Sequence, residues 1–365
     1  MRLSAVLRLL GALIGREIEA SNGRSSSCRQ PGAGCSSTRQ DRLVIWPTTA
    51  KGRWRCPPPT DVAVLDSILT DHSDDGVRRA CLALGRDAEL AAVLAARLTV
   101  ESVVLSDEQV AGFFENGFLA VQQMSSPGEI AVICGIYDQL FASKQGQGQG
   151  LYTDIPQEAH LEGQYFFPKI HQIYRVAPEL CATGFMANAR AMATQLFRSD
   201  LEFLGGHGFR KPAHSPSETP WHQDQAYHQP NFIFRNVNFW LALQDTPVEA
   251  GTMEFTVGSH HGNVVFEHRR PGGVKEAHGL ELVDISDLGD IVSCPVPAGG
   301  ATLHHSYTPH HTPPNKTSEP RRALIAIFAT PPTERLEPIQ FSWQEDKAAK
   351  PGLGPVSRQS VNQMA

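Results

Sequence analysis

The sequence predicts a mainly β protein with flanking helices, in which the strands close into a barrel or sandwich. Beyond residue 165, short β-rich runs such as "NFIFRNVNFWLALQD" (231–245) alternate with Pro/Gly turns. The preceding half carries apolar residues at helical spacing. The 365 residues, 41% hydrophobic and 19% charged, can form one large domain with appendages or two smaller domains.

Composition argues against two classes of partner, nucleic acid and membranes. A net charge of -6 argues against nucleic acid or acidic lipid, which require a basic surface. The sequence contains no apolar run of about 18 residues, the length that a membrane helix needs. No feature specifies an oligomeric state. Seven cysteines without a C-x-x-C pair indicate reduced thiols in the cytoplasm and disfavour thiolate zinc.

The N-terminal region, residues 1–58, differs from the rest. The stretch "SNGRSSSCRQPGAGCSSTRQDR" is rich in Ser, Gly and Arg and lacks the apolar periodicity of a core, which favours a disordered or leader segment. The Arg/Ser bias of residues 1–40 leaves an organellar targeting peptide as the alternative, although Glu17 and Glu19 count against it.

Three further regions follow along the chain. Residues 59–104 read as a helical prefix, with the periodic runs "AVLDSILTD" and "DAELAAVLAARL". Residues 105–335 form the main domain. It opens with a helix capped by Ser106 and Gln109, ends that helix at Asn116-Gly117, and continues into the strand "FLAV". The "KQGQGQG" run lacks phosphate-loop spacing and predicts a flexible loop, and residues 336–365 form a C-terminal tail.

The stretch "TPWHQDQAY" (219–227) carries the first metal-binding signal. On a strand, residues i and i+2 share a face, so His222 and Asp224 are expected to aim an imidazole and a carboxylate at one point. A second histidine would complete the 2-His-1-carboxylate triad of non-haem iron oxygenases. Spacing alone leaves four candidates: His304, His305, His310 and His311.

An arginine pair follows those histidines and opens an apolar strand, "RRALIAIF". Guanidinium binds carboxylate in a bidentate manner, which suits the distal carboxylate of a 2-oxoglutarate co-substrate. Because strand side chains alternate between faces, only one of Arg321 and Arg322 can point into the barrel.

Three blocks resemble the phytanoyl-CoA dioxygenase family of Fe(II)/2-oxoglutarate-dependent oxygenases. They are "PWHQDQAY" (220–227), "NFWLALQDTPVEAGTMEFTVGSHHG" (238–262) and "PAGGATLHHSYTPHHTPPNKTSEPRRAL" (297–324), and the resemblance covers about residues 105 to 332. It implies a double-stranded β-helix (jelly-roll, cupin-like) core with iron at its open end. The chain departs from the family where the usual Phe-His before the distal ligand is His304-His305.

The resemblance also selects the site residues. It implies as metal ligands His222, Asp224 and His310, and as 2-oxoglutarate contacts Arg321, Thr312 and, from the "PKI" segment, Lys169. Trp221 and Tyr227 flank the ligands and are candidates for the substrate pocket.

The activity that the resemblance implies is a dioxygenase reaction using Fe(II), 2-oxoglutarate and O2, with ascorbate as a candidate reductant. The enzyme would hydroxylate a C–H bond of an acyl-CoA or secondary metabolite and release succinate and CO2. A carboxylate at Asp224 favours hydroxylation, because related iron halogenases carry a small residue there. Two alternatives remain: a non-catalytic metabolite-binding relative, and a zinc or nickel cupin enzyme. The second would require an H-x-H pair, which the β-rich half lacks.

Overall fold

The structure is a computed structural model that describes residues 73–156, 166–271, 279–337 and 339–345. The described residues belong to one compact unit, Cys56–Ala365. The expected leader (1–58) and the helical run at 63–71 lie outside the described residues.

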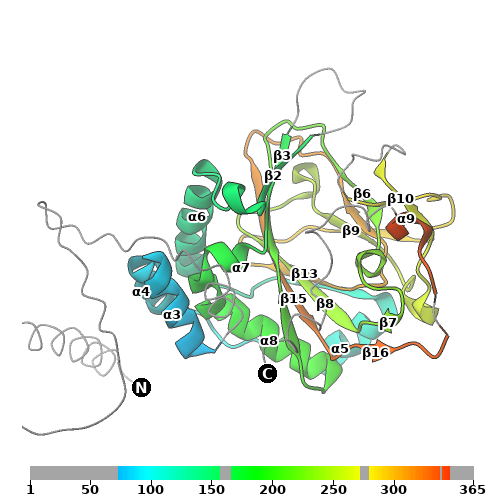
Figure 1. The fold of residues 1–365 in the computed structure, drawn as a ribbon, viewed down its shortest axis with the longest axis horizontal. Coiled ribbons are helices and arrows are strands. Elements are labelled where there is room, and N and C mark those ends of the chain that lie inside the picture. The colour runs from blue at the N-terminus through cyan, green and yellow to red at the C-terminus, as the bar shows by residue number, and fades with distance from the viewer. Residues whose placement is uncertain (1–72, 157–165, 272–278, 338, 346–365) are drawn as a thin grey trace, which may run out of the picture. The chain divides into compact units, whose positions relative to one another are not determined.

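One group of helices lies together on one side of this unit (Figure 1). It consists of α3 (Asp74–Leu84), α4 (Asp87–Arg97), α6 (Pro127–Ala142), α7 (Ile173–Val176) and α8 (Gly184–Phe197). Helix α5 (Asp107–Asn116) lies apart from this group, and α9 (Ser342–Glu345) lies on the opposite side, where Trp343 packs against His268. The expected capping box is present on α5, where Ser106 and Gln109 bond reciprocally. Gly117 ends that helix at φ 87°, a left-handed conformation that glycine adopts without steric cost. The "KQGQGQG" loop contains one short 3-10 turn, Gln147–Gln149.

An eight-stranded major sheet lies beside the helices. Its order is β1-β13-β8-β15-β5-β3-β2, with β4 also paired to β15. The bounds are β1 (Phe118–Val121), β2 (Tyr152–Pro156), β3 (Phe166–His171), β4 (Glu202–Gly205), β5 (His207–Lys211), β8 (Asn236–Ala242), β13 (Ala301–His305) and β15 (Arg321–Ala329). The "FLAV" strand is therefore confirmed as β1, an edge strand of this sheet.

A four-stranded minor sheet, ordered β12-β9-β14-β6, faces the other side of the major sheet. Its strands are β6 (Thr219–His222), β9 (Met253–Thr256), β12 (Ile291–Cys294) and β14 (His310–Thr312). Two short pairs complete the fold: β10 (His268–Arg269) with β11 (Glu281–Leu282), and β7 (Phe232–Ile233) with β16 (Thr333–Glu334). All these pairings are antiparallel. Two facing antiparallel sheets of this kind make the expected jelly-roll core.

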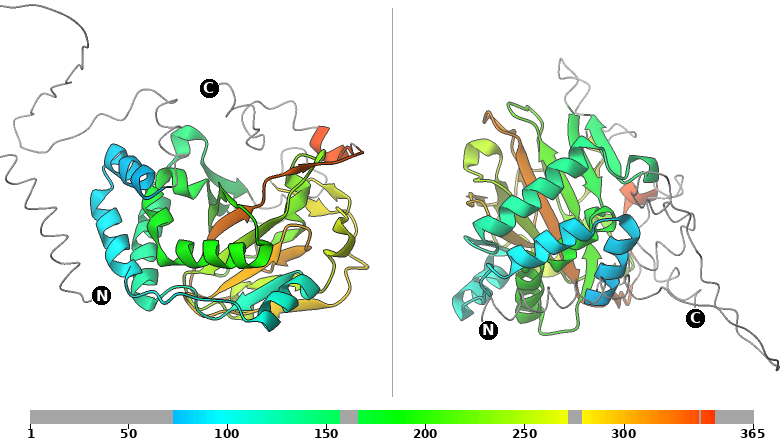
Figure 2. Two further views of the ribbon diagram at one scale, coloured as in Figure 1. Left: turned by 90° about the horizontal axis from the view of Figure 1, so that it is seen from below. Right: turned by 90° about the vertical axis from the view of Figure 1, so that its left-hand side faces the viewer.

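The central strands of the major sheet divide their side chains between two cores. On β8, Val237, Phe239 and Leu241 join a large apolar cluster with α6 and α8. The alternate residues Trp240 and Ala242 join a smaller cluster with Phe255 of the minor sheet. The helices therefore cover the outer face of the sheet, and the space between the sheets holds the inner face (Figure 2).

The expected helical prefix shares the outer core. Val77 and Cys81 of α3 and Val93 of α4 are buried in the same cluster as α6 and α8. The described cysteines, at positions 81, 134, 181 and 294, are all free thiols. Within the described ranges, every helix is too short or too polar to cross a bilayer.

Candidate metal centre

The H-x-D pair lies where β6 ends. The expectation that both residues sit on one strand is wrong: His222 is the last residue of β6, and Asp224 opens the 3-10 turn Asp224–Tyr227. The chain bends after Gln223 and brings the carboxylate back toward the imidazole. The two side chains still converge, with His222 Nε2 3.8 Å from Asp224 Oδ1.

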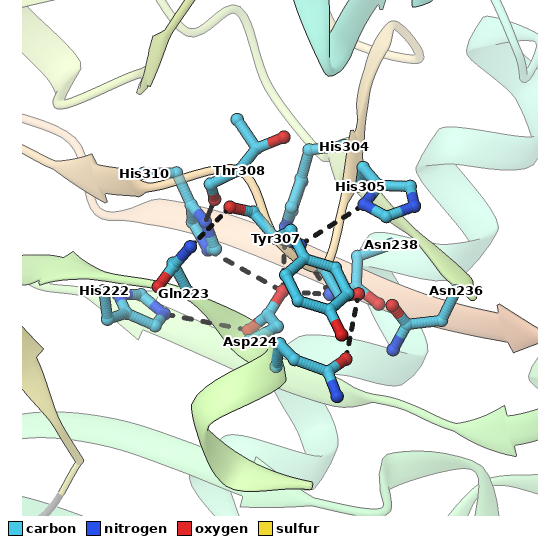
Figure 3. Close-up of polar contacts among 12 residues, drawn as sticks. His222, Gln223, Asp224, Asn236, Asn238, His304, His305, Tyr307, Thr308 and His310 are labelled. Carbon is cyan, nitrogen blue, oxygen red and sulfur yellow. Dashed lines mark hydrogen bonds and ion pairs between the residues drawn. The ribbon is translucent and has the colours of Figure 1, made fainter. Parts of the chain in front are cut away.

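The structure brings His310 to this pair. On β14, His310 lies directly opposite His222 of β6, and the two ring centroids are 4.3 Å apart. Its Nε2 is 3.8 Å from Asp224 Oδ2. One donor atom from each of His222, Asp224 and His310 falls within 4.8 Å of the other two (Figure 3). Metal–ligand bonds of about 2 Å allow donors at such separations to share one ion after small adjustments.

Backbone carbonyls set the tautomers of both imidazoles. His222 Nδ1 donates to Pro220 O at 2.8 Å, and His310 Nδ1 donates to Thr308 O at 2.9 Å. A neutral imidazole that donates from Nδ1 carries its lone pair on Nε2. Both Nε2 atoms are those that face Asp224, so this donor set fits a divalent transition metal.

Two residues that the sequence reading missed hold Asp224. His304 Nε2 donates to Asp224 Oδ2 at 3.0 Å, and Asn238 Nδ2 donates to the same oxygen (Figure 3). A carboxylate only accepts, so His304 carries its proton on Nε2 and cannot ligate through that atom. Oδ2 is thereby occupied, and Oδ1 is left for an ion. The missed signal was the departure from Phe-His to His304-His305, which adds a donor on the inner face of β13.

Burial and mutual contact tune the charges of the centre. Burial lowers the pKa of His222 and holds the pKa of His310 well below its ordinary value. Burial alone would raise the pKa of Asp224, but the imidazoles of His310, His304 and His222 outweigh it and hold that pKa below its usual range. Two neutral imidazoles and one carboxylate therefore present a single negative charge to a cation.

A buried clamp fixes the backbone between the two H-x-D ligands. Gln223 N donates to His268 Nε2 at 3.0 Å, and His268 Nδ1 donates to Phe266 O at 2.7 Å. The Gln223 side chain donates to Val264 O and Tyr307 O at 2.9 and 2.6 Å. The turn that aims Asp224 is therefore held by segments from both sides of the site.

Arg321 lies inside the barrel, whereas Arg322 points out. Arg321 is 2% exposed, its Nη1 donates to Gly251 O at 2.8 Å, and its guanidinium lies over the Trp240 ring at 5.2 Å. Burial lowers its pKa to about 10, so it stays charged at neutral pH. In the described part of the chain, no carboxylate pairs with Arg321, and its Nε has no hydrogen-bond partner. Arg322 instead pairs with Asp138 at 2.7 Å.

Thr312 and Lys169 are the other two expected 2-oxoglutarate contacts. Thr312 is buried two residues after His310 on the same face of β14. Lys169, on β3, lies with its Nζ 4.7 Å from the centre of the Phe209 ring. Burial lowers its pKa to about 8, against the opposing influence of Asp224. Both residues are therefore placed on the inner faces of the two sheets.

Trp221 and Tyr227, the candidates for the substrate pocket, have different surroundings. Trp221 stacks on His311 with centroids 4.1 Å apart, among the outward side chains of the minor sheet. Trp221 therefore points away from the metal centre, because it is adjacent to His222 on β6 and neighbouring strand residues face opposite ways. Tyr227 lies 6.0 Å from the His222 ring and accepts a hydrogen bond from Leu280 N at 2.8 Å. It therefore borders the metal centre and holds the segment after β10 near it.

A comparison with known protein families matches residues 113–323 to the phytanoyl-CoA dioxygenase family. The matched residues include His222, Asp224 and His310. The match spans more than half of the 365 residues, and the chain belongs to this family.

Individual relatives match the chain over shorter segments. The chain is 31% identical over 127 residues to a protein named probable alpha-ketoglutarate-dependent hypophosphite dioxygenase from Stutzerimonas stutzeri. It is 31% identical over 117 residues to phytanoyl-CoA dioxygenase domain-containing protein 1 from Bos taurus. These segments are 33% and 32% of this chain, and the chain spans only 42% and 40% of the two relatives.

A solved structure extends the likeness to the whole core. The EvdO2 protein of Micromonospora carbonacea var. aurantiaca, in complex with 2-oxoglutarate, superposes with a TM-score of 0.56 at 27% identity. The match covers 67% of this chain and 99% of that one. The jelly-roll core with flanking helices is therefore shared with a protein whose crystal contains 2-oxoglutarate.

Proposed function

We propose that this member of the phytanoyl-CoA dioxygenase family is an Fe(II)- and 2-oxoglutarate-dependent dioxygenase that hydroxylates a C–H bond of a small molecule. One observation carries the proposal. A His-Asp-His donor set and a buried guanidinium that no described carboxylate neutralises both lie between the two sheets of the jelly roll. A buried cation without a counter-ion is costly, so its presence points to an anionic ligand.

His222, Asp224 and His310 would hold the ion on one face. His304 and Asn238 keep Asp224 Oδ2 engaged, so Asp224 would bind through one oxygen and leave coordination positions for the co-substrate. Bound Fe(II) supplies O2 activation coupled to the oxidative decarboxylation of 2-oxoglutarate to succinate and CO2. Retention of a carboxylate at position 224 favours hydroxylation as the outcome.

Arg321 and Thr312 would bind the far carboxylate of 2-oxoglutarate. Two residues along β14 advance the chain by about 6.6 Å, so Thr312 lies roughly the length of a five-carbon diacid from His310. The Arg321 guanidinium can donate from Nε, which no described residue occupies. Its cation–π contact with Trp240 holds the guanidinium plane in position. The oxo-acid end would then reach the ion only when the far end is seated.

The polar inner face of β3 and β5 favours a polar substrate. Lys169 of β3 lies in register with Phe209 of β5, and His171 lies in register with His207. The ring centroids of His171 and His207 are 5.6 Å apart, and burial, together with the nearby Lys169, holds the pKa of His207 well below its ordinary value. Such a face suits an acyl-CoA or an oxygen-rich secondary metabolite better than a bare hydrocarbon. The hypophosphite named for the Stutzerimonas stutzeri relative is also a polar anion.

The test is O2 uptake and succinate formation when 2-oxoglutarate is added to Fe(II)-loaded protein, followed by a turnover screen of small molecules. We expect uptake that requires both Fe(II) and 2-oxoglutarate. A protein that binds both without turnover would be the non-catalytic relative. Tight zinc or nickel binding with no 2-oxoglutarate dependence would identify the other cupin-type enzyme.

A further inference from the structure

Lys211 is a fully buried lysine beside the proposed co-substrate pocket, and the preceding roles do not use it. It is the last residue of β5, has 0% exposure and lies directly opposite Arg321 of β15. Its Nζ donates to Thr312 O at 3.1 Å, to Thr312 Oγ1 at 3.0 Å and to Pro313 O at 2.6 Å. A major-sheet residue is thus bonded to the end of the strand that carries His310.

The hydrogen bonds from Lys211 determine which group the Thr312 hydroxyl can donate to. Lys211 Nζ donates to acceptors on both Thr312 and Pro313, and the Thr312 hydroxyl oxygen is one of them. Thr312 Oγ1 accepts from Lys211, so the hydroxyl keeps its own hydrogen for another acceptor. Among the residues that the structure describes, none accepts it. A ligand oxygen in the cavity is the partner that such a hydroxyl lacks.

We propose that Lys211 is a positioning residue for the co-substrate: it turns Thr312 into a hydrogen-bond donor toward the far carboxylate and holds β14 at the correct distance from Arg321. The inference rests on the proposed use of 2-oxoglutarate. It assigns specificity for a dicarboxylate over a monocarboxylate 2-oxo acid to a contact between the two sheets.

The surrounding backbone explains why the contact is needed. The pairing of β14 with β6 shifts register between His310 and Thr312, and a strand next to such an irregularity is not fixed by regular pairing alone. Pro313 O also packs against Gly251, which has a φ of 73°. A Cβ added at Gly251 would collide with this oxygen. Gly251 O in turn accepts from Arg321 Nη1. The segment between Thr312 and Arg321 is therefore one bonded unit with Lys211 at its centre.

Charge supports the same role. Burial and the neighbouring Arg321 both lower the pKa of Lys211. A carboxylate bound beside these two groups would offset the repulsion between them. The pair therefore suits a ligand whose far end is anionic and disfavours one whose far end is a methyl group.

The test compares 2-oxoglutarate with pyruvate, which has the same metal-binding oxo-acid group and no far carboxylate. Binding to the anaerobic Fe(II) protein is measured by calorimetry for the wild type, Lys211→Met, Thr312→Val and the double variant. We expect Lys211→Met to weaken 2-oxoglutarate binding roughly 10- to 100-fold, the usual range for a charge-assisted hydrogen bond, and to leave pyruvate binding unchanged. The double variant should lose less than the product of the two single losses.

Each outcome separates the inference from the proposed function. Equal loss for both ligands, or strictly multiplicative losses in the double variant, would overturn the positioning role and leave a structural one. No 2-oxoglutarate binding by the wild type would overturn the proposed function itself. Lys144→Met is the control, because Lys144 forms a partly exposed ion pair with Asp154.

A buried Lys→Met change can prevent folding, so a second comparison stands beside it. Thr312→Ser retains the hydroxyl and Thr312→Val removes it. The inference requires the serine variant to keep the preference for 2-oxoglutarate over pyruvate and the valine variant to lose it. An unchanged preference in Thr312→Val would overturn it.

Discussion

The inner and outer faces of the major sheet use the same strands for opposite purposes. On the outer face, Phe239 of β8 and Phe328 of β15 are fully buried in the large apolar cluster shared with the helices. On the inner face, alternate residues of the same strands are Asn238, which bonds Asp224, and Arg321, which lacks a described counter-ion. One face therefore stabilises the fold, while the other leaves polar groups ready for ligands.

This division explains how the fold tolerates the destabilising polar groups buried in the site. Buried polar groups without partners destabilise a protein, and the inner face contains several, including Arg321 Nε, Asn238 Oδ1 and His304 Nδ1. The well-packed outer face offsets them. Variants of the inner face should therefore affect binding and turnover, and variants of the outer face should affect stability.

The largest expected effect comes from a pair of adjacent histidines on β14. His310→Ala removes a proposed ligand and should reduce succinate formation at least about 10³-fold, equivalent to about 4 kcal/mol in activation free energy. His311→Ala should retain most activity, because His311 bonds Glu254 at 2.7 Å away from the centre. Similar rates of succinate formation in the two variants would contradict the assignment of His310 to the metal centre and of His311 to the outward side of β14.

An outer-face change should have the reverse profile. Phe239→Ala removes a fully buried ring and should lower the free energy of unfolding by about 3 to 5 kcal/mol. The folded fraction should keep wild-type affinity for Fe(II), because Phe239 points away from the metal centre. Denaturant unfolding with a parallel Fe(II) titration measures both quantities, and a large loss of Fe(II) affinity in folded protein would contradict the separation.

Arg321 and Arg322 are adjacent at the start of β15 and point to opposite faces of the major sheet, so they test the comparison between the two faces directly. Arg321→Met should raise the KM for 2-oxoglutarate about 100-fold, a loss of about 3 kcal/mol that is typical of a buried charge partner. Arg322→Met should leave the KM unchanged, because it removes only the ion pair with Asp138. Steady-state succinate assays at varied 2-oxoglutarate test this, and a KM change in Arg322→Met alone would reverse the assignment.

The smallest expected effect concerns His304. His304→Phe restores the Phe-His pair typical of the family and removes one donor to Asp224 Oδ2. We expect Fe(II) affinity to fall about 10- to 100-fold, the range seen when a residue that orients a metal ligand is changed. His305→Phe is the matched control, since His305 follows on the opposite side of β13. Unchanged Fe(II) affinity in His304→Phe would show that Asn238 suffices.

The sequence predicted the parts of the site that depend on local pattern. The H-x-D pair and the capped helix at Ser106 follow from residue type and spacing, and strand alternation allows only one of Arg321 and Arg322 to face inward, while the family resemblance selects Arg321. The helix α6 was not identified, because its apolar residues occur on most sides and blur the helical period. The placement of Asp224 on a strand was wrong, because the turn depends on contacts of Gln223 with distant segments.

Spacing left four histidines open and the family resemblance selected His310, but the physical reason for that choice lies in the fold. Spacing could not separate His304 from His310, since both reach Asp224. Hydrogen bonds separate them: His310 Nδ1 donates to the carbonyl of Thr308, whereas His304 Nε2 is committed to the carboxylate. Tautomers depend on neighbours brought together by β14 and β13, which no single stretch of sequence reveals.

The central claim is that His222, Asp224 and His310 bind a ferrous ion that 2-oxoglutarate joins. Anaerobic titration of the Fe(II)-loaded protein with 2-oxoglutarate, followed by the visible charge-transfer absorption of the complex, tests it most directly. We predict a saturable one-to-one signal that Asp224→Ala abolishes. Absence of the signal in the wild type, or its persistence at full strength in Asp224→Ala, would contradict the account.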